Sequence, residues 1–336
     1  MSADAATDGA DAGTGPADAA ASCNAGCAST HCFVTLATSQ PGASALAIDG
    51  TSVYWTTNSG PSPSRVMKVG LSGGVPVQLA SLEGPIWALA VNGTSVYFTN
   101  GRAASTSVSI ESMPLAGGAP TTLISGQSAQ VLALDSANMY WTNQGTGTNG
   151  TVMKMPLDGG SPTTLASGQA YPNTIAVDAT SAYWTNAYEF TGSINTMVSS
   201  VMRVSLNAGA TPVMLASDQY LVHAIVSDGT SAFWVTEYGT VVREPVAGGP
   251  TTVFASGQDQ PIAVALDATN VYWANQGTGR SGSIGTVPQA GGATVLLYQS
   301  EEIDSNTGGE PIDLAVDATS VYWTDPTVGT VNKMCK

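Results

Sequence analysis

Short runs of Val, Tyr, Trp and Thr alternate with clusters of Gly, Pro, Asn, Asp and Ser along most of this 336-residue chain. Brief apolar runs between turn-forming residues are typical of β-strands. Helix formers such as Lys, Glu and Leu are sparse. The pattern therefore predicts an all-β protein.

One unit recurs seven times after Cys32, and its copies contain LAIDGTSVYWTTN, LAVNGTSVYFTN, LALDSANMYWTN, IAVDATSAYWTN, IVSDGTSAFWVTE, VALDATNVYWAN and LAVDATSVYWTD. The aromatic residues at the centre of the copies are Tyr54, Tyr97, Tyr140, Tyr183, Phe233, Tyr272 and Tyr322. They lie 43, 43, 43, 50, 39 and 50 residues apart. These spacings match or approach the period of a four-stranded propeller blade.

Four strands are expected in each full copy, and in the third they fall at 132–134, 138–142, 151–156 and 163–166. The last copy stops after its third strand, whereas Phe33 to Ala37 matches a fourth strand with none before it. Pairing the two ends would complete one blade and hide the open strand edges. Residues 32–336 are therefore predicted to form a seven-bladed β-propeller of four-stranded antiparallel blades, in which the N- and C-terminal strands share one blade.

Residues 1–31 differ sharply in composition from the repeats. Up to about Ala21 they are almost entirely Ala, Asp, Gly, Thr and Ser, which cannot bury enough apolar surface to offset the entropy of ordering. We expect a disordered linker with a cysteine-containing end.

All four cysteines lie near the chain ends, at Cys23, Cys27, Cys32 and Cys335. Aligning the repeats places Cys32 and Cys335 on opposite sides of one hairpin turn, which predicts a Cys32–Cys335 disulfide and leaves Cys23 to pair with Cys27. Disulfides imply an oxidising compartment. The alternative is a zinc site formed by these three N-terminal cysteines and His31, although the spacing lacks the usual zinc-ligand intervals.

The formal net charge is −15, from 24 acidic and nine basic residues. Such a surface repels nucleic acid and anionic lipid, and the sequence has no apolar run long enough to span a membrane. The N-terminus also lacks the regions of a signal peptide, so a leader was either removed or never present. We expect a monomer in the cell envelope or outside the cell, with attachment through a lipid on a removed leader as one alternative.

The last unit, LAVDATSVYWTDPTVGTVNKM, resembles the YWTD repeat of propellers in low-density-lipoprotein-receptor-like proteins and of uncharacterised bacterial propeller proteins. The resemblance covers residues 32–336, and it implies protein binding on one propeller face. Receptor-type YWTD propellers have six blades and flanking EGF-like modules, whereas this chain has seven copies and no such modules. For these reasons no residue role is carried over.

Residues that every copy shares are interpreted as scaffold. The acidic or amide residue before each turn is expected to bind its own turn backbone rather than a metal; these residues are Asp49, Asn92, Asp135, Asp178, Asp228, Asp267 and Asp317. The Gln or Glu position of each copy and the Trp or Phe after each central aromatic are interpreted in the same way. We therefore expect no metal site and no cofactor.

Function is expected where the repeat breaks, on the face with the connections into the inner strands. The longest loops there are predicted at 186–200 and 300–310. The candidate binding residues are Trp87, Arg102, Tyr188, Tyr220, His223, Glu237, Tyr238 and Arg280. Aromatic rings beside a few polar groups suit a protein or carbohydrate ligand.

No nucleophile elbow, HExxH pattern, EF-hand loop or Rossmann fingerprint occurs in the sequence. The leading hypothesis is a non-enzymatic binding module without catalytic residues. The alternatives are a lyase or hydrolase that uses His223 with Glu237 or Asp313 at the channel mouth, and a structural envelope protein. Streptogramin lyases are also seven-bladed propellers, but none of their motifs is found here.

Overall fold

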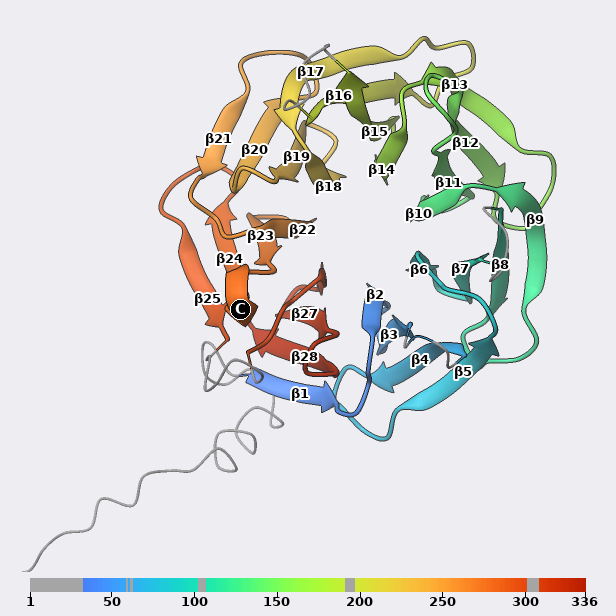
Figure 1. Ribbon diagram of the computed structural model, residues 1–336, viewed down its shortest axis with the longest axis vertical. Coiled ribbons are helices and arrows are strands. Elements are labelled where there is room, and N and C mark those ends of the chain that lie inside the picture. The colour runs from blue at the N-terminus through green and yellow to red at the C-terminus, as the bar shows by residue number, and fades with distance from the viewer. Residues whose placement is uncertain (1–32, 59, 61–62, 102–106, 191–196, 301–307) are drawn as a thin grey trace, which may run out of the picture.

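The computed structural model describes residues 33–58, 60, 63–101, 107–190, 197–300 and 308–336. These residues form seven four-stranded antiparallel sheets arranged as blades around a central axis (Figure 1). The seven-bladed β-propeller is thus confirmed. Each blade runs outward from an inner strand near the axis.

The strands follow one another in chain order within six of the blades. Blade 1 comprises β2 (Ala43–Ile48), β3 (Ser52–Thr57), β4 (Ser64–Gly70) and β5 (Val77–Leu82). Blade 2 comprises β6 (Leu89–Val91), β7 (Ser95–Gly101), β8 (Val108–Pro114) and β9 (Thr121–Gln127). Blade 3 comprises β10 (Ala129–Leu134), β11 (Asn138–Asn143), β12 (Gly150–Pro156) and β13 (Thr163–Gln169). Blade 4 comprises β14 (Pro172–Val177), β15 (Ser181–Phe190), β16 (Met197–Ser205) and β17 (Val213–Tyr220). Blade 5 comprises β18 (Val222–Ser227), β19 (Ser231–Thr236), β20 (Thr240–Pro245) and β21 (Thr252–Ala255). Blade 6 comprises β22 (Pro261–Leu266), β23 (Asn270–Asn275), β24 (Ser283–Pro288) and β25 (Val295–Gln299). A short 3₁₀ turn, η1 (Thr278–Arg280), precedes β24.

Blade 7 joins the two ends of the propeller. It comprises β26 (Asp313–Val316), β27 (Ser320–Asp325), β28 (Thr330–Cys335) and, on the outside, β1 (Phe33–Ala37). In the β1–β28 ladder, Phe33 faces Met334 and Val34 faces Lys333. The predicted closure by terminal strands is therefore confirmed.

The core lies between the blades. The Trp or Phe of each blade packs in one cluster with the Tyr or Phe of the preceding blade, as Trp141 does with Tyr97. Trp55 of blade 1 packs in the same way with Tyr322 of blade 7, which closes the ring. Burial of large aromatic rings at every junction supplies the main stabilisation of the ring.

A hydrogen bond reinforces the blade junctions. In five of them a glutamine Oε1 accepts from the indole Nε1 of the next blade at 2.7–3.2 Å; the pairs are Gln40–Trp55, Gln127–Trp141, Gln169–Trp184, Gln219–Trp234 and Gln258–Trp273. The glutamine also donates to the backbone, as Gln169 Nε2 does to the Ser167 carbonyl. The scaffold interpretation of this position is correct for these glutamines.

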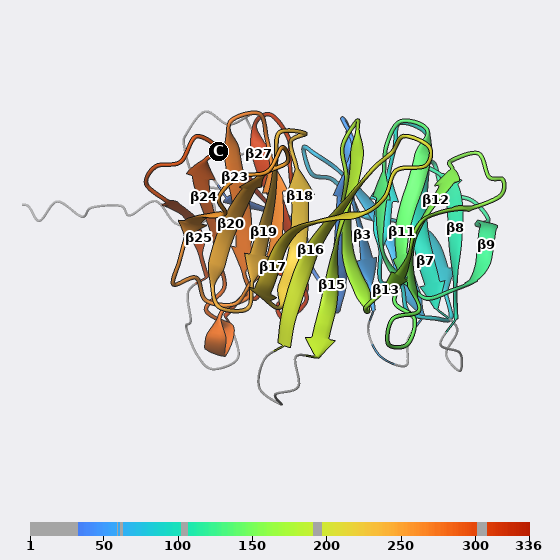
Figure 2. The same cartoon turned by 90° about the horizontal axis from the view of Figure 1, so that it is seen from above.

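The two ends of the blades form two faces. The turn face carries the connections after each inner strand, at Asp49, Asn92, Asp135, Asp178, Asp228, Asp267 and Asp317, and the glycine-pair turns. The loop face carries the connections between the second and third strands and those into the next inner strand. In Figure 2 the turn face is at the top, with the C-terminus, and the loop face is at the bottom, where β15 ends.

The prediction of a long loop at 186–200 is wrong over much of that range. Instead β15 and β16 continue as a ladder in which Glu189 faces Val198 and Phe190 faces Met197. Pairing satisfies the backbone hydrogen bonds of the inserted residues, which an irregular loop would leave to water. Blade 4 therefore extends further than its neighbours on the loop face (Figure 2).

Candidate functional site

The turn-face carboxylates are structural, as expected. In five blades one aspartate oxygen accepts backbone N–H groups of its own turn and the other accepts from the central tyrosine hydroxyl, as Asp178 does from Thr180 N, Ser181 N and Tyr183 Oη at 2.7, 3.0 and 2.7 Å. Burial alone would raise the pKa of Asp178, but the hydrogen bonds from Tyr183 and the turn lower it below its usual range. Burial and the contact with Asp178 raise the pKa of Tyr183 to about 12. These side chains are occupied in holding the blade together.

Four of the predicted binding residues come together on the loop face of blade 5. Tyr220 ends β17, His223 lies on β18, and Glu237 and Tyr238 occupy the turn between β19 and β20. This turn has Thr236 opposite Thr240 and Gly239 in a left-handed conformation, with φ 73°. A Cβ at Gly239 would lie 2.1 Å from the Gln258 carbonyl oxygen, so only glycine fits there.

Tyr220 and Tyr238 form an aromatic platform. Their ring centroids are 3.7 Å apart and their planes differ by 14°. Tyr238 is 70% exposed, so one face of the stack is open to a ligand. Leu221 next to Tyr220 has φ 36°, and its carbonyl accepts from Glu237 N at 3.0 Å. This contact fixes the two connections, and hence the two rings, relative to each other.

A polar pair lies beside this platform. His223 Nε2 is 2.6 Å from Glu237 Oε2, and the two side chains are 29% and 40% exposed. A carboxylate at this distance forms a hydrogen bond with the imidazole and orients the ring. The pair can donate and accept hydrogen bonds to a ligand on the stack. We name Tyr220, His223, Glu237 and Tyr238 the blade 5 cluster.

Trp87 and Arg280, two of the other predicted residues, do not join the blade 5 cluster in the structure. Trp87 precedes β6 in blade 2, is 44% exposed, and packs against Gly101, where a Cβ would lie 2.7 Å from the indole. Arg280 ends η1 in blade 6, and its carbonyl accepts from Ser300 Oγ at 3.0 Å. Tyr188 lies on β15, but its side chain lies outside the described part of the structure, as does all of Arg102. The role of these four residues stays a prediction.

Asp313 does not meet His223. It begins β26 in blade 7, where Oδ2 accepts from Leu46 N of blade 1 at 2.8 Å and Oδ1 from Leu314 N at 2.9 Å. Burial raises the pKa of Asp313 to about 6, although the two backbone hydrogen bonds oppose the shift. The contact links the inner strands of the first and last blades, which is a structural role.

Metal binding and cysteine pairing are tested only in part. Over the described ranges, no group of three or more His, Cys, Asp or Glu side chains is placed to hold a metal ion. Cys335 is disulfide-bonded, but Cys23, Cys27, His31 and Cys32 lie outside the described residues. The pairing with Cys32 therefore stays a prediction, and the zinc alternative is untested. No helix within the described segments is long and apolar enough to cross a membrane.

Sequence reasoning missed two features of the turn face. One is a Lys or Arg that lies at the blade junctions, and the other is a pocket between blades 2 and 3 where this cation is missing. The signal was present in the sequence, because a basic residue recurs on the third strand of most copies, as in KVG, KMP and KMC. Only the structure shows what the residue contacts.

Comparison with known proteins supports the fold. No protein-family model matches the sequence, and no curated protein matches it. Among solved structures, virginiamycin B lyase from Staphylococcus aureus, in complex with quinupristin, aligns with a TM-score of 0.67 and 15% identity over 90% of this chain and 98% of that one. A puromycin hydrolase gives a TM-score of 0.62 and 13% identity over 86% of this chain and 51% of that one. A putative TolB from Agrobacterium tumefaciens gives 0.51 and 11% over 67% and 85%.

These matches define the class of protein. The chain is a seven-bladed β-propeller, similar in fold to propellers that include a lyase, a hydrolase and TolB proteins. At such low identity the likeness carries no activity over, since one fold hosts many unrelated functions. The YWTD resemblance has no matching family model and stays an expectation.

Proposed function

We propose that this propeller is a binding module of the cell envelope or extracellular space, and that it engages a protein or glycan at the blade 5 cluster. The observation that carries the proposal is the stacked pair of Tyr220 and Tyr238, with Tyr238 70% exposed. A rigid aromatic platform beside hydrogen-bonding groups suits both sugar rings and peptide side chains. The disulfide at Cys335 supports an oxidising compartment.

The net charge of −15 narrows the class of ligand. A strongly acidic surface favours neutral or cationic partners and disfavours nucleic acid and other polyanions. A neutral glycan or a peptide with basic residues is therefore a better ligand for this protein than an acidic glycan or peptide.

The proposal is tested by screening the purified chain against glycan and secreted-protein arrays, together with Tyr238→Ala. Val75→Ala is the matched control, because Val75 is 86% exposed and lies in a turn-face connection. We expect a hit that weakens at least about tenfold in Tyr238→Ala and is unchanged in Val75→Ala. A hit that survives Tyr238→Ala would place binding elsewhere, and the absence of any hit would contradict a binding module of either kind.

A second candidate function is an acid–base enzyme, which the 2.6 Å contact between His223 and Glu237 favours. The direct test is turnover of candidate substrates, starting with quinupristin, by the wild type and by His223→Ala. Turnover that disappears in His223→Ala would support the enzyme. Turnover that persists in the variant would exclude the pair as its active site.

A further inference from the structure

A repeated cation holds the blade junctions on the turn face. In four blades a lysine Nζ lies over the central tyrosine ring, at 4.7–5.7 Å from its centroid; the pairs are Lys68–Tyr54, Lys154–Tyr140, Lys333–Tyr322 and Lys336–Tyr272. In blades 4 and 5 an arginine faces the central aromatic in the ladder instead, and Arg203 and Arg243 each donate to a turn serine at about 3 Å. Six of the nine Lys and Arg residues of the chain thus lie on the turn face, four over a central tyrosine ring and two bonded to a turn serine.

Several of these cations reach into the next blade. Lys333 Nζ donates to the Leu71 carbonyl at 3.0 Å, and Lys68 Nζ donates to the Leu115 carbonyl at 3.3 Å. Lys336 follows β28 of blade 7 but contacts blade 6, where its Nζ donates to Asp267 and lies over the Tyr272 ring. Thr286 occupies the usual lysine position opposite Tyr272. A cation from elsewhere in the chain can therefore complete a junction that lacks its own.

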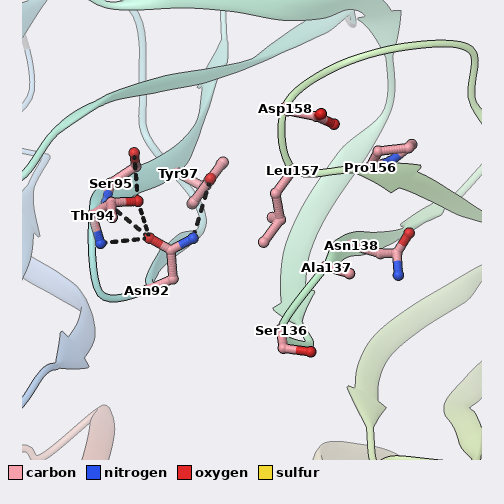
Figure 3. Close-up of a pocket in the computed structure, with 10 residues that line it drawn as sticks. All are labelled: Asn92, Thr94, Ser95, Tyr97, Ser136, Ala137, Asn138, Pro156, Leu157 and Asp158. Carbon is pink, nitrogen blue, oxygen red and sulfur yellow. Dashed lines mark hydrogen bonds between the residues drawn. The ribbon is translucent and has the colours of Figure 1, made fainter.

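Blade 2 differs from all the other blades. Ser112 faces Tyr97 in the ladder where Lys68 faces Tyr54 in blade 1, and Asn92 stands where the other blades have Asp. A pocket of about 660 Å³ lies at this junction, between Asn92, Thr94 and Tyr97 of blade 2 and Asn138, Leu157 and Asp158 of blade 3 (Figure 3). The structure thus has a pocket where the repeat elsewhere places an ammonium or guanidinium group.

The groups that hold the cation elsewhere are present in this pocket. Tyr97 supplies the ring. Leu157 is equivalent to Leu71 and Leu115, since the N–H of each leucine donates to the turn of its own blade, at Ala137, Thr51 and Thr94 respectively. The Leu71 and Leu115 carbonyls are the acceptors of Lys333 and Lys68. Asp158 adds a carboxylate to the pocket wall.

Asn92 does not remove a contact that the cation needs. Within the described residues, Lys336–Asp267 is the one ion pair formed by these junction cations, so Lys68 and Lys333 are held by ring and carbonyl without a carboxylate. Asn92 Nδ2 donates to Tyr97 Oη at 3.3 Å, whereas Tyr54 Oη donates to Asp49 at 2.7 Å. The tyrosine stays anchored in both blades.

We propose that the pocket between blades 2 and 3 binds a primary alkylammonium group, supplied by a lysine side chain of a partner or by a free diamine. The ammonium would lie over the Tyr97 ring and donate to the Leu157 carbonyl, as Lys68 and Lys333 do within the chain. Asp158 and the net charge of −15 favour the cation further. This site is on the turn face, opposite the blade 5 cluster, and does not depend on the proposed function.

The test measures backbone amide shifts of the full chain by NMR during titration with three probes. These are Nα-acetyl-lysine amide, cadaverine, and Nα-acetyl-norleucine amide, which has the same chain without the ammonium. We expect the first two to shift amides at 92–97 and 157–158, with a dissociation constant of about 1 mM because the site is open to solvent. The norleucine probe should leave these amides unshifted.

Two variants make the result specific. Ser112→Lys introduces the residue that blades 1, 3 and 7 carry at this position, so it should fold, fill the pocket from within and weaken probe binding by about tenfold or more. Ser112→Ala is the matched control and should bind like the wild type. A tighter complex with cadaverine would identify a free diamine as the source, and a tighter complex with the lysine probe would identify a partner protein. Equal binding of norleucine amide, no binding of either amine, or undiminished binding by Ser112→Lys would overturn the proposal.

Discussion

The two faces of the propeller use the same strands but follow different rules. On the turn face each aspartate caps its own turn, most central tyrosines are bonded to it, and cations fill the junctions. On the loop face, blade 5 presents an open aromatic stack and blade 4 extends its hairpin, and neither feature recurs in another blade within the part of the chain that the structure describes. Contacts that recur in most blades therefore stabilise the propeller, whereas residues that depart from the repeat form surface that is available to ligands. Blade 2 shows that the turn face also has one such departure.

The largest loss of stability is expected in blade 7, because this blade joins the two ends of the chain. We expect Cys335→Ser to lower the free energy of unfolding by about 4 kcal/mol, since the predicted disulfide with Cys32 closes a loop of about 300 residues. The register supports this pairing, because the ladder that pairs Phe33 with Met334 would next pair positions 32 and 335. Guanidinium chloride denaturation measures the loss.

The control for this experiment is the double variant Cys23→Ser/Cys27→Ser, which should keep nearly all the stability. Peptide mapping under non-reducing conditions gives an independent check. A Cys335 peptide linked to Cys23 or Cys27 would show that the predicted pairing is wrong.

The turn-face aspartates should rank next. Asp178→Ala removes the acceptor of two turn N–H groups, of the Tyr183 hydroxyl and of the Ser227 hydroxyl, for an expected loss of about 3 kcal/mol. Asp228→Ala is the matched control, because blade 5 has Phe233 in place of the tyrosine, and it should lose only about 1 kcal/mol for the turn contacts. Equal losses measured by urea denaturation would mean that the tyrosine contact adds nothing.

The contact between Asp313 of blade 7 and Leu46 of blade 1 should make the free energy of unfolding depend on pH. The pKa of Asp313 is raised to about 6 in the folded chain, so the folded state favours its protonated form. Its contribution to stability is fully present below the unfolded pKa near 4 and is lost as the pH rises through about 6. We expect a loss of about 2 kcal/mol between pH 4 and 7 from this group.

Asp313→Asn separates this effect from other titrations, because the amide cannot ionise. Unfolding free energies at several pH values should fall less steeply in the variant over this range. The turn-face carboxylates with lowered pKa, such as Asp178, act in the opposite direction and below pH 4. An unchanged slope in Asp313→Asn would assign the pH dependence to another group.

The smallest expected change in stability is at the blade 5 cluster. Tyr238→Ala should alter the free energy of unfolding by no more than about 0.5 kcal/mol, because the side chain is mostly exposed. Tyr183→Ala, at a fully buried ring, should cost about 4 kcal/mol. Thermal denaturation of both variants compares the two faces directly, and a large loss in Tyr238→Ala would make the stack part of the scaffold.

Much of the scaffold could be predicted because each copy of the repeat encodes its own local structure. The turn residues, the central aromatics and the small inner-strand residues recur with the period of the blades, and their contacts are within one blade or to its neighbour. The incomplete last copy and the unpaired strand at Phe33 likewise required one solution, since an open edge in blade 7 would leave backbone groups unpaired. The sequence alone therefore determined the seven blades, their strand order and their closure.

The tertiary structure decided which side chains meet between connections that follow no repeat. Tyr220 and Tyr238 were candidates individually, but their stacking depends on the turn at Gly239 and the contact at Leu221. The link from Asp313 to Leu46 and the reach of Lys336 into blade 6 join residues far apart in the chain. Periodicity fixes what each blade contains, whereas the packing of blades around the ring fixes the contacts between them, and the candidate ligand sites lie where those contacts depart from the repeat.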